Sequence, residues 1–155
     1  EFTHRALGNR SILADPRKFE MQKKVNSAVK YRESFRPFAP ATIEEKAPEI
    51  FDMSKKTKIP FMEKAVLVKK NWRKKIPAVV HVDGTARVQT INKNFNKKFY
   101  NLINEFYKIT NVPVLLNASF NLNGEPIVMS PSDAIRTFHT CGLDILVSKD
   151  YVVEK

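Results

Sequence analysis

A continuous apolar run near the carboxyl end places the strongest constraint on how this chain can fold. Residues 112–116 read Val-Pro-Val-Leu-Leu, with no polar side chain among them. A strand of this kind has no face that suits water, and it is typical of a sheet that is covered on both sides. The chain therefore needs helices that can pack on each face of a central sheet.

Three stretches predict those helices. Residues 96–110 carry apolar side chains at helical spacing, namely Phe99, Leu102, Ile103 and Phe106. A second helix begins after the N-cap Ser130 and should end near Gly142. Asp15 has the same capping chemistry and predicts a helix over residues 16–28, whose buried stripe is Met21, Val25 and Ala28.

Strand signals alternate with these helices. Two prolines push their preceding residues out of helical geometry, so residues 35–43 should be extended. Residues 78–90 read as an apolar strand, an Asp-Gly turn and a second strand that carries Arg87 and Gln89 on one face. Further strands are predicted at residues 126–129 and in two pieces within residues 144–153.

The order of these elements indicates the fold class. Strands and helices alternate without an internal repeat, which predicts an α/β or α+β fold with a mixed sheet flanked by helices. At 155 residues the chain is expected to form one domain, residues 1–155. Residues 52–75 are rich in Lys, with Ser54, Thr57 and Asn71 among them, and there we expect one weak strand and no catalytic group.

The charge balance points to anionic partners. The chain has 27 basic and 16 acidic residues and a net charge of +11, which suits nucleotides, nucleic acid or an acidic protein domain. Much of this charge lies in runs at residues 55–58, 69–75 and 93–98, which are typical of solvated surface. A non-enzymatic nucleic-acid binder is an alternative hypothesis, because aromatic residues lie beside these runs at Trp72, Phe95, Phe99 and Tyr100.

Other features bear on the compartment of the protein. The single cysteine, Cys141, excludes an internal disulfide, and no apolar run approaches the roughly 18 to 20 residues of a membrane span. We therefore predict a cytoplasmic protein without a membrane partner. The chain enters a motif within its first residues, where we expect no signal peptide, and we therefore expect it to be a piece of a longer chain.

Basic side chains form three clusters that suit an anion site. Arg5 and Arg10 flank Asn9 in a short loop around one glycine. On the extended segment, alternation would place three cations on one face, Lys30, Arg32 and Arg36. Arg87 adds a third location in the Asp-Gly turn region. The alternative is a solvated cationic edge.

Neutral hydrogen-bonding groups follow the buried strand. Ser119 and Asn121 lie just beyond it, at the strand end where α/β folds usually bind ligands. Cations around a hydroxyl and an amide suit phosphoryl or acyl-phosphate chemistry, in which positioning and charge neutralisation do most of the work. The chain has no P-loop lysine motif.

Metal and thiol chemistry find less support in the sequence. His4, His81 and His139 have no ligand spacing among themselves, so no metal ligands are predicted. Cys141 follows His139 by two residues, and such positions do not face each other on a helix.

Four long motifs occur in the chain in a fixed order. They are RALGNRSILADPR at residues 5–17, FRPFAP at 35–40, HVDGTARVQ at 81–89 and PVLLNASFN at 113–121. Together they resemble the C-terminal domain of the NodU/CmcH-type O-carbamoyltransferases. In addition, Lys30-x-Arg32 and Ser119-x-Asn121 are similar to the Lys-x-Arg and Ser-x-Asn pairs of YrdC-like threonylcarbamoyl-AMP synthases.

This resemblance implies a YrdC-like domain that binds ATP with Mg²⁺ and carbamoyl phosphate and forms carbamoyl adenylate with loss of pyrophosphate. It further implies that a separate, metal-binding N-terminal domain passes the carbamoyl group to a sugar or natural-product hydroxyl. Carried over by motif, the catalytic residues are Lys30, Arg36 and Arg87. The substrate-binding residues are Arg5, Asn9, Arg10, Arg32, Ser119 and Asn121, of which Ser119 and Asn121 would orient the adenylate. An interdomain packing module without activity is a further alternative.

Overall fold

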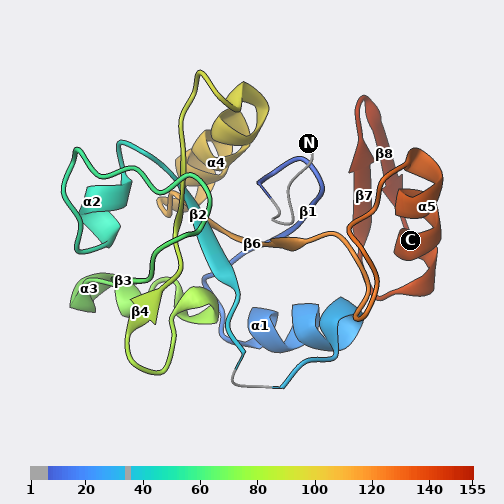
Figure 1. The fold of residues 1–155 in the computed structure, drawn as a ribbon, viewed down its shortest axis with the longest axis horizontal. Helices are drawn as coiled ribbons and strands as arrows, with labels where there is room; N and C mark the ends of the chain where they lie inside the picture. The colour runs from blue at the N-terminus through green and yellow to red at the C-terminus, as the bar shows by residue number, and fades with distance from the viewer. Residues whose placement is uncertain (1–6, 34–35) are drawn as a thin grey trace.

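A mixed four-stranded sheet forms the centre of the molecule. The computed structural model describes residues 7–33 and 36–155. The strand order is β1-β6-β2-β5, with β1 at Ser11–Ala14, β6 at Val114–Ser119, β2 at Ala39–Ile43 and β5 at Gln89–Ile91 (Figure 1). β6 is antiparallel to both β1 and β2, whereas β2 and β5 are parallel. The predicted fold class is therefore confirmed.

Helices cover both faces of the central strand, as its apolar sequence requires. Leu115 packs with Phe99 and Ile103 of α4 (Lys97–Thr110) on one face. Its neighbours Val114 and Leu116 point the opposite way, into a larger core. That core includes residues of α1 (Glu20–Val25), of the π-helical segment η1 (Asn26–Lys30) and of α5 (Pro131–Thr140). Figure 1 shows α4 and α1 on opposite sides of β6.

Shorter elements complete the described structure. They are α2 (Ala47–Ile50), β3 (Val66–Leu67), α3 (Lys70–Arg73), the 3₁₀ helix η2 (Pro77–Val79), β4 (Thr85–Ala86), β7 (Ile145–Ser148) and β8 (Tyr151–Glu154). β3 pairs with β4, and β7 with β8. The predicted helices at 96–110 and after Ser130, the weak strand within 52–75 and the two strands within 144–153 are all present.

One helix and one extended segment differ from the prediction in their boundaries. The first helix begins at Glu20 and not at residue 16: Asp15 accepts from the Arg17 backbone N–H, as an N-cap would, but residues 16–19 form turns and a bend, not helix. Helical geometry then continues through η1 to Lys30. The extended conformation expected from residue 35 is formed from Ala39 onward, and residues 34 and 35 lie outside the described part of the chain.

Three strand expectations are also wrong in detail. The apolar residues at 78–82 form η2 and a turn, not a strand. Residues 126–129 are not a strand: Pro126 has no N–H group, and Val128 bonds to Phe120 O through its N–H and to the Arg10 side chain through its carbonyl, not to a neighbouring strand. β6, in contrast, extends through Asn117 to Ser119, where a polar loop was expected to start.

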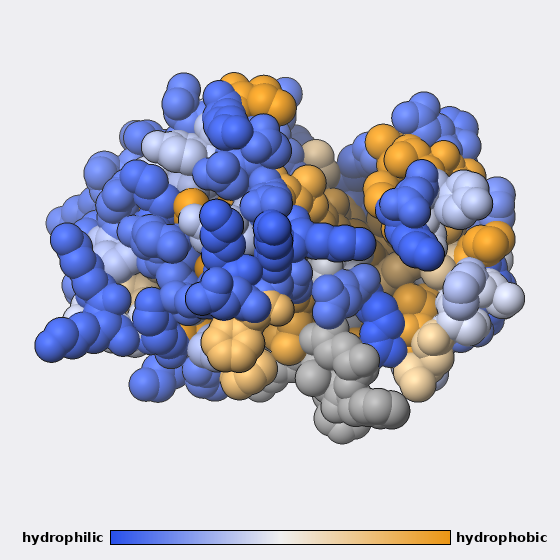
Figure 2. Space-filling model, turned by 90° about the horizontal axis from the view of Figure 1, so that it is seen from above, coloured by the Kyte–Doolittle hydropathy of each residue, from blue (hydrophilic) through white to orange (hydrophobic). Residues whose placement is uncertain are grey.

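The β7–β8 hairpin presents apolar side chains to solvent. Val147 pairs with Val152 across the hairpin, and both side chains are more than 60% exposed. Ile145 is about half exposed. Seen from above, apolar atoms gather on the lobe formed by this hairpin and α5, whereas the larger body is mostly hydrophilic (Figure 2). Among the described helices, none is both long enough and apolar enough to cross a bilayer.

Candidate functional site

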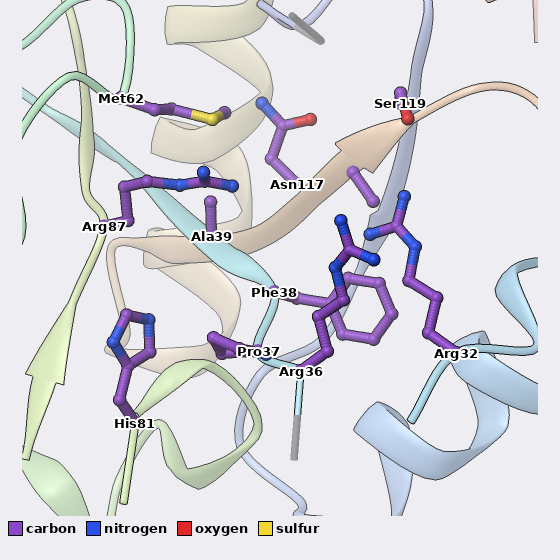
Figure 3. A pocket seen from close by; sticks show the side chains of 11 residues that line it. Arg32, Arg36, Pro37, Phe38, Ala39, Met62, His81, Arg87, Asn117 and Ser119 are labelled. Carbon is purple, nitrogen blue, oxygen red and sulfur yellow. The ribbon is translucent and has the colours of Figure 1, made fainter. Parts of the chain in front are cut away.

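A pocket of about 550 Å³ opens beside the last residues of β6. Its walls come from the segment between η1 and β2, the first residue of β2, the segment between α2 and β3, the turn before β4, Arg87 between β4 and β5, and β6 itself. The polar side chains that line it are Arg32, Arg36, His81, Arg87, Asn117 and Ser119. Figure 3 shows these side chains around one space. Sequence-distant motifs thus meet at one strand end.

Three guanidinium groups converge on the pocket. In Figure 3, Arg32 and Arg36 extend towards the Ser119 end of β6, and Arg87 extends across towards Asn117. The pKa of Arg32 is lowered, first by burial and then by repulsion from Arg36 and Arg87. Within the described part of the chain, no carboxylate lines this pocket. Such a cluster is suited to a ligand with several negative charges, such as a phosphate.

The backbone at Arg32 is held by a local amide clamp. Asn26 donates from Nδ2 to the Arg32 carbonyl at 2.7 Å and accepts from the Arg32 N–H at 3.0 Å. Tyr31, the residue before Arg32, adopts a left-handed conformation with φ of 46° and ends η1. The chain thereby turns at a fixed point, and this turn brings Arg32 to the pocket.

Lys30 lies fully buried behind the pocket wall. Its Nζ is 2.7 Å from Ser119 O, 3.1 Å from Ser119 Oγ, 2.8 Å from Asn121 O and 2.6 Å from Asn121 Oδ1. The Ser119 hydroxyl in turn donates to Asn121 Oδ1 at 2.6 Å. Burial lowers the pKa of Lys30 to about 7, with a smaller contribution from the positive charge of Arg32. Lys30 therefore fixes the loop that ends β6.

The expected placement of Lys30 on a strand is wrong. η1 keeps helical geometry up to Lys30, so the alternation of an extended chain does not relate it to Arg32 and Arg36. The three residues nevertheless reach the same end of β6. Lys30 contacts Ser119 from the interior, while Arg32 and Arg36 line the pocket.

The opening loop lies next to this strand end, and the side chains described there are engaged elsewhere. Arg10 donates from Nη1 to Val128 O at 3.1 Å, and Asn9 accepts from Asn96 at 3.2 Å. Neither lines the pocket. Gly8 has a φ of +97°, and a Cβ at this position would collide with the Phe99 ring, so glycine lets the loop approach α4. Arg5 lies outside the described residues.

Seven lining residues were not predicted as site residues, and three of them, Asn117, Met62 and His81, have side chains that bear on the site. Asn117 donates to Gln89 Oε1 at 2.7 Å and holds β6 and β5 together across β2. Met62 comes from the segment where no functional residue was expected. His81 was considered only as a metal ligand, and its ring instead faces the pocket below Arg87 (Figure 3). The usable signal for Asn117 was a polar residue at the end of an apolar strand.

Comparison with known proteins adds a family match. The family model for the carbamoyltransferase C-terminus matches residues 1–155. The whole chain is 51% identical to nodulation protein NolNO of Sinorhizobium fredii and 51% identical to nodulation protein NolO of Bradyrhizobium diazoefficiens. It covers 23% and 28% of these proteins. Nodulation protein U of B. diazoefficiens is 49% identical over 120 residues, which are 77% of the chain and 21% of that protein. The chain thus spans about a quarter of the length of these curated relatives.

Proposed function

The chain belongs to the carbamoyltransferase C-terminal family, and from this premise we propose that its pocket binds carbamoyl phosphate and ATP and produces carbamoyl adenylate. In this reaction carbamoyl phosphate, ATP and one water molecule give carbamoyl adenylate, phosphate and pyrophosphate. The observation that carries the proposal is the convergence of Arg32, Arg36 and Arg87 on one pocket without an acidic neighbour in its described lining.

The chemistry of the lining fits these two substrates. Both carry phosphate groups that paired guanidinium donors can bind, and the charge that develops during phosphoryl transfer lies on the same oxygens. Ser119 and Asn121, fixed by Lys30, give the pocket edge a rigid geometry. A magnesium ion would arrive on the nucleotide phosphates, since no three His, Cys, Asp or Glu side chains gather as metal ligands in the described residues.

Transfer of the carbamoyl group to its acceptor is assigned to another part of a longer protein. The chain spans only about a quarter of its curated relatives, which leaves ample length for an N-terminal transferase domain. The acceptor would be a hydroxyl of a sugar or natural product. Action in the cytoplasm remains a prediction.

Pyrophosphate release is the direct test of adenylate formation. With ATP, magnesium and carbamoyl phosphate, the 155-residue chain should release pyrophosphate only when both substrates are present. Arg87→Ala should lower this rate about 100-fold, because it removes a preorganised cationic donor. Arg136→Ala removes the same charge from an exposed site on α5, where Arg136 pairs with Glu125, and should keep the wild-type rate. Release that needs no carbamoyl phosphate, or equal rates in both variants, would contradict the proposal.

The nucleic-acid alternative finds less support. Its aromatic platform includes Trp72, but Lys75 lies 4.5 Å above the centre of that ring and covers one face of it. A nucleic-acid site would instead show oligonucleotide affinity that falls steeply with salt and disappears when residues 69–75 are neutralised.

A further inference from the structure

A chain of hydrogen bonds determines how His81 faces the pocket. The Thr85 hydroxyl lies 2.7 Å from Asp83 Oδ1 and 2.9 Å from His81 Nδ1. Asp83 also accepts from the Thr85 backbone N–H, and these two bonds lower the pKa of its carboxyl group. An ionised carboxylate has no hydrogen to give, so the hydroxyl hydrogen of Thr85 goes to Asp83. Nδ1 of His81 must then be the donor to the Thr85 oxygen.

The opposite ring nitrogen consequently carries a lone pair. A neutral imidazole has one N–H group, and here that group is at Nδ1. The pKa of His81 is lowered chiefly by burial, with Arg87 adding to the effect and Asp83 opposing it, which favours the neutral ring. Within residues 7–33 and 36–155, no hydrogen bond engages Nε2. The ring lines the pocket below Arg87 (Figure 3).

Most of the polar surface around this lone pair consists of donors. Arg32, Arg36 and Arg87 can only donate hydrogen bonds. The Ser119 hydroxyl has its hydrogen committed to Asn121 and accepts from Lys30. Nε2 of His81 is therefore an acceptor in a pocket whose cations suit phosphate oxygens, and it can accept a hydrogen bond from a ligand N–H or O–H group.

Building on the proposed function, we infer that His81 Nε2 accepts a hydrogen bond from the amide group of carbamoyl phosphate and so selects a carbamoyl group over other acyl groups. The phosphate oxygens are acceptors and suit the arginines, whereas the carbamoyl NH₂ is the donor of this substrate. Acetyl phosphate has a methyl group at the same place, and a methyl group cannot donate to Nε2. Thr85 and Asp83 act as positioning residues, since they hold the hydrogen of His81 on Nδ1.

Binding preference tests this inference. The 155-residue chain is titrated calorimetrically with carbamoyl phosphate, acetyl phosphate and inorganic phosphate. The wild type should bind carbamoyl phosphate about tenfold more tightly than acetyl phosphate, the worth of about one hydrogen bond. His81→Phe should reduce this preference to about onefold and leave the affinity for inorganic phosphate unchanged, because the arginines remain.

Variants of Thr85 test whether its hydroxyl positions His81. They change the preference for carbamoyl phosphate over acetyl phosphate, which a change in packing alone would leave as it is. Thr85→Val keeps the shape of the side chain but removes the hydroxyl, so Nδ1 loses its acceptor and the preference for carbamoyl phosphate should fall. Thr85→Ser retains the hydroxyl and should restore the preference. Melting temperatures of the variants, measured in parallel, report whether each one is folded.

The possible results separate the inference from the proposed function. If the wild type binds carbamoyl phosphate and His81→Phe keeps the tenfold preference, the inference is wrong and the proposed function stands. If the wild type does not bind carbamoyl phosphate, the proposed function itself is wrong. The adenine amine offers the same donor chemistry, so ATP and inosine triphosphate are compared as well. If His81→Phe changes only the preference for ATP over inosine triphosphate, His81 binds the nucleotide and the inference is wrong.

Discussion

Lys30→Met is expected to lower the free energy of unfolding by about 3 kcal/mol, although the methionine fills much of the same space. The lysine is fully buried, and its Nζ is surrounded by four oxygen atoms of Ser119 and Asn121 at 2.6 to 3.1 Å. Methionine cannot donate to any of them, so several acceptors lose their partner in the interior. Urea unfolding followed by circular dichroism measures the difference.

An exposed lysine of the neighbouring helix provides the matched control. Lys24 pairs with Asp144 at the surface, and Lys24→Met should change the free energy of unfolding by less than about 0.5 kcal/mol. Equal effects of the two substitutions would show that the interior contacts of Lys30 contribute nothing particular to the fold.

The pH dependence of the same comparison tests the charge of Lys30. Its pKa is lowered from 10.5 to about 7 in the folded protein, mainly by burial. Between these values the unfolded chain binds a proton that the folded chain lacks, so stability rises with pH. The stability of the wild type relative to Lys30→Met should therefore increase from pH 7 to pH 9, by up to about 1.4 kcal/mol per pH unit. A flat difference would mean that the four oxygens keep the ammonium charged and outweigh burial.

The second large effect is expected for ligand binding. A double variant, Arg32→Ala with Arg87→Ala, should bind carbamoyl phosphate about a thousandfold more weakly than the wild type. Each arginine supplies charge-assisted hydrogen bonds of about 1.5 to 3 kcal/mol, and both lie in the same pocket. Isothermal titration calorimetry at constant salt measures the loss.

A control with the same net charge isolates the pocket from the overall charge of the chain. Arg17→Ala with Arg136→Ala removes two arginines that pair with Asp15 and Glu125 at the surface. This control should bind within about threefold of the wild type, since screened surface charges contribute little. Equal losses in both double variants would attribute binding to the net charge of +11 and not to the pocket.

The framework of the fold was predictable where a local pattern and the tertiary environment agree. The apolar stripe of α4 and the buried run of β6 each demand one kind of neighbour, and both elements are present, although Leu102 is exposed and β6 runs on to Ser119. The capping box at Ser130 and Asp133 likewise fixed the start of α5. Asp15 shows the opposite case, because its carboxylate accepts from both the backbone and the side chain of Arg17, yet no helix begins before Glu20.

The site was predictable in its charges but not in its geometry. The cations Arg32, Arg36 and Arg87 were identified from the sequence, and they line one pocket. The interior position of Lys30 depends on a π-helical segment that no local pattern indicated. The role of His81 depends on a tautomer that hydrogen bonds of the folded turn determine. The spacing His-x-Asp-x-Thr within a turn was the available signal.

A crystal structure of this chain soaked with carbamoyl phosphate would measure directly whether the three arginines form the acyl-phosphate site. We expect density for the phosphate group in contact with Arg32, Arg36 and Arg87, with the carbamoyl nitrogen directed to His81 Nε2. Density for the ligand at another surface, such as the basic run at residues 69–75, with this pocket left to solvent, would contradict the assignment.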